Sequence, residues 1–257
     1  MEEKHSPDQQ NPDAETPIIV ATQKRNWSSY IKEFIMLFLA VFCGFLAENY
    51  RTYLSERSQE KQYLTSMVEE LIQDTTMFNI EIQYIKENMK KADTLIDLLV
   101  SPDIRLYGSD VYYLGRTVSR NNALVIHNKT IQQMTNSGGF RMIQSRNLSN
   151  EILAYYNSLV FIEHLHNVER EEVSKYRELA ISVFHPKTFD AVVKPDNSII
   201  RPSGNPALLS YKPEQLIPIA GMLAYIKGAR KTLSINYLQM KADSIKLIQL
   251  LEKEISE

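Results

Sequence analysis

The chain has 257 residues, of which 44% are apolar, with eight glycines, ten prolines and a formal net charge of −2. Few helix-breaking residues and ample apolar content favour long helices, in one helical domain with an anchor, over many short strands. The charge is close to neutral and no basic stripe is present, which argues against a nucleic-acid partner. Cys43 is the single cysteine, so an intrachain disulfide and a cysteine-rich metal site are excluded.

An apolar run lies at residues 34–47, which read FIMLFLAVFCGFLA without a charged side chain. A helix of this length spans about 21 Å, short of the roughly 30 Å of hydrocarbon in a bilayer. Lys32 can extend the span, because its stem can lie in lipid while its ammonium reaches the interface. Trp27 and Tyr50 stand where interfacial aromatic residues flank a transmembrane helix. We therefore predict a transmembrane segment whose membrane-embedded residues are Phe34, Met36, Leu37, Phe38, Leu39, Val41, Phe42, Phe45 and Leu46.

Two other interpretations of this run stay open. The core helix of a soluble protein can be equally apolar, but it needs protein on every side, and this run lies between a polar tail and a charged segment. A cleaved signal peptide has an apolar region of this length. Cleavage after Ala47, however, would place Phe45 at the −3 position, where a small residue is required. An uncleaved signal anchor is therefore the favoured interpretation.

The anchor divides the sequence into three regions. Residues 1–26 are mostly polar and aperiodic, and we expect them to be disordered. Residues 27–54 form the transmembrane anchor with its interfacial flanks, and residues 55–257 form a helical bundle domain. Three basic residues lie on each side of the span, so the positive-inside rule does not decide its orientation. We expect a single-pass protein of a bacterial inner membrane, with a cytoplasmic tail and a periplasmic C-terminal domain.

A heptad repeat follows at residues 64–99. Its members alternate at intervals of four and three residues with Thr75 as the polar exception, which is typical of a coiled-coil-like helix. Further apolar residues widen this face and favour a helix of an intramolecular bundle. A dimerising stalk, in which helix 64–99 contacts a second copy or a protein partner, stays an alternative. The repeat comprises Leu64, Val68, Leu71, Thr75, Phe78, Ile82, Ile85, Met89, Ala92, Ile96 and Leu99, and the residues that widen it are Met67, Ile72, Ile80, Leu95 and Leu98.

Two short helices are predicted after this repeat. Ser109 or Asp110 can cap the first, which ends near Arg120. The second covers residues 129–136, and the glycines after it, beginning with Gly138, would stop it with a positive-φ cap. Both helices are short enough to act as connections between longer elements.

Two further long helices complete the predicted fold. One reaches from Leu148 to about Phe184, and after it a proline-rich irregular connection covers residues 187–211. The last helix runs from Pro213 to the C-terminus with apolar residues at helical intervals. The predicted fold class is all-α, with an N-terminal transmembrane helix that continues into an antiparallel bundle of long helices.

Three segments of the sequence resemble a group of uncharacterised bacterial single-span membrane proteins. The first is EFIMLFLAVFCGFLAENYRTYLSERSQEKQYLTSMVEEL, the second is IQQMTNSGGFRMIQSRNLSNEILAYY, and a weaker third is SIKLIQLLEKEI. The most specific motif residues include the pair Ser137 and Gly138 and the pair Tyr155 and Tyr156. Gly139 departs from the pattern, which more often has a polar residue there. The resemblance implies a membrane-anchored helical domain of unknown function, and it implies no chemistry.

Glu163 and His166, at i and i+3 of a predicted helix, are weak candidates for metal ligands. Helical di-iron sites use Glu-x-x-His, but they need a second such helix and two further glutamates. Arg170 lies one turn further on and would oppose a bound cation. We therefore interpret the pair as part of a solvated polar face and predict no metal, no cofactor and no catalytic residue. The motifs Gly-x-Ser-x-Gly and His-Glu-x-x-His are absent, so the protein is not predicted to be an enzyme.

Two functions of different classes remain. The favoured one is a structural or protein-interaction module, because the sequence combines heptads and a neutral charge with no catalytic set. The alternative is a sensory or small-ligand-binding extracytoplasmic helical domain, since helical bundles can bind small molecules between their helices.

Overall fold

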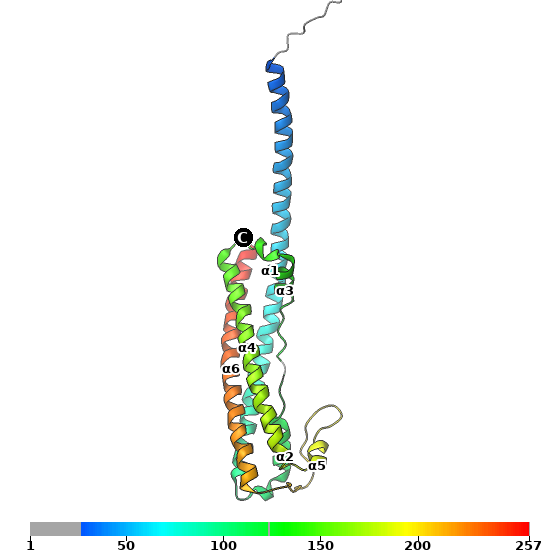
Figure 1. Ribbon diagram of the computed structural model, residues 1–257, viewed down its shortest axis with the longest axis vertical. Helices are drawn as coiled ribbons and strands as arrows, with labels where there is room; N and C mark the ends of the chain where they lie inside the picture. Colours follow the sequence, from blue (N-terminus) through cyan, green and yellow to red (C-terminus); the bar gives the residue numbers. More distant parts are fainter. Residues whose placement is uncertain (1–26, 123, 257) are drawn as a thin grey trace, which may run out of the picture. The chain divides into compact units, whose positions relative to one another are not determined.

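The computed structural model describes residues 27–122 and 124–256, and its regular elements within these residues are all helices (Figure 1). The predicted all-α fold is confirmed. The tail of residues 1–26, predicted to be disordered, lies outside the described residues. In chain order the α-helices are α1 (Trp27–Val100), α2 (Gly108–Val118), α3 (Lys129–Ser137), α4 (Arg146–Ala180), α5 (Pro186–Ala191) and α6 (Pro213–Ser256), with 3₁₀ turns at Ile104–Leu106 and Gly139–Met142.

The chain divides into two compact units between Tyr53 and Leu54. The described part of the first unit is the beginning of α1, where every residue from 27 to 53 is exposed. α1 is a helix long and apolar enough to cross a membrane, and none of its apolar window is buried. Such exposure suits a helix that contacts lipid, whereas the core helix of a soluble protein is covered by its neighbours. The described part of the chain therefore carries one candidate membrane span, near the N-terminus.

The second unit is an antiparallel bundle of three long helices and one composite element. α1 from residue 54 onward, α4 and α6 lie side by side, and α6 runs opposite to the other two (Figure 1). The composite element consists of α2, the irregular residues 120–122 and 124–128, and α3. α2 lies at one end of the bundle and α3 at the other, so this element takes the place of a fourth helix (Figure 1).

The core-facing side of α1 differs from the predicted heptad stripe at half of its positions. Every seventh residue from Leu64 to Leu99 is buried, as predicted. The alternate predicted positions, such as Val68, are half-buried, and the residue one place before each is buried instead. This second row is partly polar, so an apolar pattern could not find it. The row comprises Glu60, Met67, Asp74, Glu81, Asn88 and Leu95.

The residues predicted to widen this face divide into two groups. Met67 and Leu95 are buried in the core, and Leu98 packs against it. Ile72 and Ile80 are 50% and 52% exposed, so the prediction is wrong for these two. Their positions lie beyond the two rows that α1 turns toward the bundle.

The short helices of the composite element are present, but the first begins differently from the prediction. α2 starts at Gly108 with no side-chain cap, so neither predicted cap is correct. The Ser109 hydroxyl donates to the Pro202 carbonyl at 2.8 Å, and Asp110 pairs with Arg201 at 2.6 Å. α3 ends as predicted, because Gly138 adopts the left-handed conformation with φ of 69°.

The last two long helices follow the prediction closely. α4 and α6 bury their apolar rows, although Val168 of α4 is 38% exposed. The connection expected to be irregular holds one more helix, α5, which Pro186 begins at its first position. A proline there has no hydrogen bond to lose, because the first N–H of a helix has no intrahelical partner.

Candidate functional site

The irregular stretch between α2 and α3 lacks the hydrogen bonds that a helix would give its own backbone. Buried backbone N–H and C=O groups nevertheless need partners. Charged residues of the long helices supply them. A charged residue also holds the chain beyond α3, because the Glu60 carboxylate of α1 accepts a hydrogen bond from the Gln144 N–H at 3.1 Å, just before α4.

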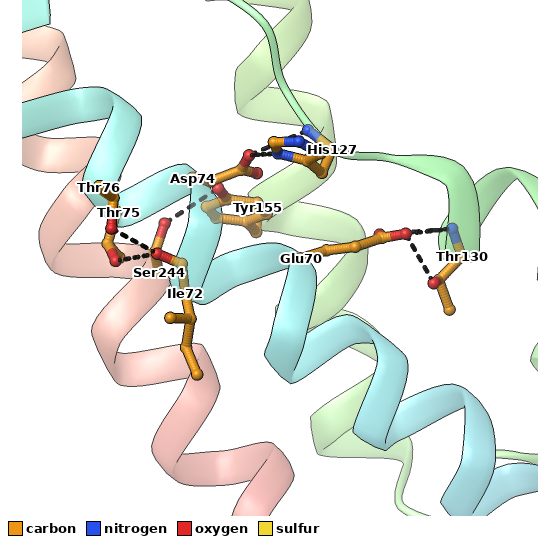
Figure 2. A network of polar contacts seen from close by, with 9 residues as sticks. All are labelled: Glu70, Ile72, Asp74, Thr75, Thr76, His127, Thr130, Tyr155 and Ser244. Atoms are coloured by element: carbon orange, nitrogen blue, oxygen red, sulfur yellow. Dashed lines mark hydrogen bonds and ion pairs between the residues drawn. The ribbon is translucent and has the colours of Figure 1, made fainter. Parts of the chain in front are cut away.

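Two carboxylates of α1 hold the end of the composite element (Figure 2). Asp74 Oδ1 accepts the main-chain N–H of His127 at 3.0 Å and lies 2.7 Å from its ring Nδ1. Glu70 accepts both the N–H of Thr130, at 3.0 Å, and the Thr130 hydroxyl, at 2.8 Å. The residue before α3, Asn128, makes no side-chain cap bond. Glu70 therefore caps α3 from another helix.

A buried ion pair holds the beginning of the irregular stretch. Arg230 of α6 is 1% exposed, and its Nε lies 2.7 Å from Glu169 of α4. The same guanidinium donates to the carbonyls of Val118 at 3.1 Å and Arg120 at 2.9 Å. The cation thus ties α4 and α6 to the chain where it leaves α2. The hydrogen bonds of Nε and Nη2 offset part of the cost of burying this pair, whereas Nη1 is buried with no hydrogen-bond partner among the described residues.

Burial raises the pKa of two carboxylates in this network. Burial raises the pKa of Asp74, against the hydrogen bonds from His127, and it raises the pKa of Glu81, against the hydrogen bond from Asn122. Asp74 Oδ2 is buried and has no hydrogen-bond partner among the described residues. The other carboxylate oxygens described here accept hydrogen bonds from groups of the same chain. We therefore interpret the network as a means of positioning the composite element.

The two weak metal candidates do not come together. Glu163 is exposed and pairs with Arg170 at 2.7 Å, which suits the predicted polar face. His166 is 8% exposed and its Nε2 lies 2.6 Å from the Tyr237 hydroxyl, so its placement on a solvated face was wrong. Burial lowers the pKa of His166. The described residues contain no group of three or more metal-binding side chains of the His, Cys, Asp and Glu types.

The motif residues of the family resemblance serve turns and packing. The Ser137 hydroxyl accepts the Gly139 N–H at 3.3 Å beside the left-handed Gly138. The rings of Tyr155 and Tyr156 meet edge to face, with centres 5.2 Å apart. Tyr155 also accepts a hydrogen bond from Ser244 of α6 at 3.0 Å (Figure 2). The buried Tyr156 hydroxyl has no partner among the described residues.

The residues that hold the composite element were missed by the sequence analysis. Asp74, Glu81 and Arg230 are charged, and such residues are normally assigned to a solvated face. One signal was present, because the heptad stripe was interrupted by a polar residue at Thr75, next to Asp74. The sequence does not say which neighbour such a residue would meet.

α6 carries a stripe of mostly apolar residues on its exposed side, in addition to the row that it buries in the core of the bundle. Its nine positions repeat at alternating intervals of four and three residues, and all are exposed. Eight of the nine are aliphatic residues or glycine, and Lys231 is the exception. Ile217, Ile235 and Leu238 are 58%, 57% and 54% exposed. This outer stripe comprises Ile217, Gly221, Ala224, Gly228, Lys231, Ile235, Leu238, Ala242 and Ile245.

Comparison with known proteins adds no relative to this picture. The chain matches no family model, no curated protein and no solved structure.

Proposed function

We propose that the protein is a membrane-anchored structural module that associates with a second copy of itself through the outer stripe of α6. The observation that carries the proposal is the exposed apolar heptad stripe. A helix face that contacts only water normally carries polar and charged residues, whereas the face that packs against the core is apolar. A two-position apolar repeat is the pattern by which one helix packs against another. The proposal assigns no catalytic step to the chain.

The glycines of the outer stripe support a contact that the single chain does not make. A Cβ atom added to Gly221 or Gly228 would meet no atom within 4 Å. The packing of this chain therefore does not require glycine at either position. Glycine inside a helix costs about 1 kcal/mol relative to alanine. Close approach of a second helix supplies a reason for glycine here, because small residues let two backbones come together.

A second copy is the occupant that we favour for the stripe. Contacts between identical chains usually use the same surface on both, so one self-complementary stripe is sufficient. A membrane anchor would confine the copies to one plane and raise their effective concentration. A lysine at one stripe position, such as Lys231, specifies register at some cost in stability. The heptad positions of helix 64–99 face the core of their own chain, so we place the contact on α6 instead.

We further propose that residues 34–47 are an uncleaved signal anchor in a bacterial inner membrane and that the bundle is periplasmic. The uninterrupted exposed apolar helix and its aromatic flanks support this proposal. The resemblance to the single-span family, to which we propose that the chain belongs, supports it as well. Protease added to spheroplasts should degrade the bundle. A C-terminal tag that is protected until the membrane is lysed would place the bundle in the cytoplasm and contradict the proposed orientation.

The association is tested with the full chain in lipid nanodiscs or mild detergent. We expect the wild type to sediment as a dimer and the double variant Ile235→Glu, Leu238→Glu to sediment as a monomer, because two carboxylates would be buried in an apolar contact. Ile80→Glu on α1 is the matched control, since Ile80 is exposed to a similar degree as Ile235. Circular dichroism should show the same helix content in all three proteins. A monomeric wild type, or a double variant that remains dimeric, would overturn the proposal.

A further inference from the structure

A hollow with apolar walls lies where α2, the end of α4 and α5 meet, apart from the outer stripe of α6. Its volume is about 530 Å³. Pockets for small molecules are commonly about 300–1,000 Å³. Aromatic rings form much of the wall, contributed by Tyr176, Phe184 and Phe189. The space is therefore large enough for a one- or two-ring molecule.

Two arginines stand in this apolar wall, Arg116 from α2 and Arg177 from α4. Neither forms an ion pair with a carboxylate within the described parts of the chain, 27–122 and 124–256. Arg177 donates to the Ser119 carbonyl at 2.6 Å. The buried Nε of Arg116 has no hydrogen-bond partner among the residues that the structure describes, and the guanidinium carbon lies 5.1 Å from the centre of the Phe189 ring. A buried donor without an acceptor is costly, so a ligand that supplies an acceptor would be favoured.

The charges of the wall indicate the class of ligand. Asp190 also lines the hollow, so two guanidinium groups face one carboxylate there. The balance is a single positive charge, which matches a monoanion. A guanidinium pairs best with a planar carboxylate through two parallel hydrogen bonds. The rings of Phe184 and Phe189 suit an aromatic body, because flat groups pack well against aromatic faces.

We infer that the hollow between α2, α4 and α5 binds an aromatic monocarboxylate, with Arg116 and Arg177 holding the carboxylate and the phenylalanine rings holding the body. Ser119, Ala180, Ile181 and Pro186 complete the wall. The inference is independent of the association through α6, because the outer stripe contributes no residue to the wall of this hollow.

The probe is indole-3-acetate, titrated by calorimetry into the full chain in nanodiscs, with indole-3-acetamide as its neutral counterpart. We expect saturable binding of one molecule per chain for the acid and binding at least roughly tenfold weaker for the amide, the scale of a lost charged hydrogen bond. Arg116→Gln should weaken binding of the acid by a similar factor. Arg170→Gln, at an exposed arginine of α4 outside the hollow, should leave it unchanged.

Arg177→Gln provides a second test in case Arg116→Gln disturbs α2, since Arg177 is exposed and its replacement removes only one hydrogen bond, to the Ser119 carbonyl. Circular dichroism of each variant checks the helix content. The inference is overturned if the acid does not bind at millimolar concentration, or if the amide binds as tightly as the acid. Binding by both arginine variants at the strength of the wild type would overturn it as well.

Discussion

Asp74 on α1 accepts the main-chain N–H of His127 at 3.0 Å, 53 positions further along the chain (Figure 2). This contact joins a fully buried position of a long helix to the irregular part of the composite element. It accounts for a polar residue in the core-facing row of α1. An apolar side chain at this position would fill the space but would leave a buried N–H without an acceptor.

Replacement of Asp74 by alanine should therefore destabilise the bundle. We expect the free energy of unfolding at pH 7 to fall by about 1–3 kcal/mol, the cost of an unsatisfied buried donor. Chemical denaturation of the full chain, followed by circular dichroism, measures the change. Gln73→Ala is the control, because Gln73 is the exposed neighbour of Asp74. Equal stability of the two variants would argue against a role of the Asp74 contact.

Asp74 should also make stability depend on pH. Burial raises its pKa above the ordinary value of 3.8, so the folded chain binds this proton more tightly than the unfolded chain. The stabilisation is then full below pH 3.8 and is lost as the pH rises through the pKa of the folded state. Asp74→Asn keeps an acceptor oxygen and cannot ionise. We expect the variant to gain stability over the wild type as the pH rises from about 4 to 7.

Denaturation of the wild type and Asp74→Asn at a series of pH values measures this difference. Titrating groups that do not interact with Asp74 act on both proteins and cancel in the comparison. A difference in the free energy of unfolding that does not change with pH would contradict the prediction.

Glu70→Ala should loosen the beginning of α3. Glu70 accepts two hydrogen bonds from Thr130, and loss of a helix cap typically costs about 1 kcal/mol. Hydrogen exchange should become faster at the amides of residues 129–131, whereas exchange in α6 should be unchanged. Glu69→Ala, at an exposed neighbouring position, should affect neither. Unchanged protection in Glu70→Ala would show that α3 does not depend on this cap.

Replacement by alanine should change the stability of the chain in opposite directions at Gly228 and at Gly108. Gly228→Ala should stabilise the chain by about 1 kcal/mol in the Ile235→Glu, Leu238→Glu background, because the new Cβ meets no atom. Gly108→Ala should destabilise it, because the new Cβ would lie 2.1 Å from the Pro206 carbonyl oxygen. Thermal melts of the two variants measure the shifts. Destabilisation by Gly228→Ala would mean that the chain's own packing needs this glycine.

Arg230 and Glu169 should show strong coupling. Arg230→Met alone leaves the Glu169 carboxylate buried without its cation, at a cost of about 3–5 kcal/mol. The double variant Arg230→Met, Glu169→Leu should be less destabilised than the two single variants added together. A double-mutant cycle from denaturation curves measures the coupling. Additive effects would show that the two side chains contribute separately.

Much of the fold could be predicted because helices are built from local hydrogen bonds and a short repeat. Ser101-Pro102, just past Val100, ended α1 as expected, and Gly138 adopted its left-handed cap after α3. The predictions failed where a residue's partner lies far away in the chain. Ser109 and Asp110 resemble caps in sequence, but both contact the segment around Pro202 and Arg201 instead.

The buried polar contacts and the hollow could not be predicted from the sequence, for a related reason. Asp74 and Arg230 look like surface residues until the irregular chain beside them is known. The arginines of the hollow belong to different helices, and Phe189 belongs to a helix that was not predicted. Such sites depend on where separate elements meet, and no single stretch of sequence carries that information.

The sequence alone determined that the protein is helical, where its long helices lie and which segment is apolar enough to span a membrane. Each of these follows from residues near one another in the chain. The tertiary structure decided which polar residues join the buried rows and which apolar residues stay exposed. α6 carries two heptad stripes, and packing against α1 and α4 buried the bulkier one and left the stripe from Ile217 to Ile245 exposed. The physical reason is that burial depends on all neighbours at once, whereas helical periodicity depends on one segment.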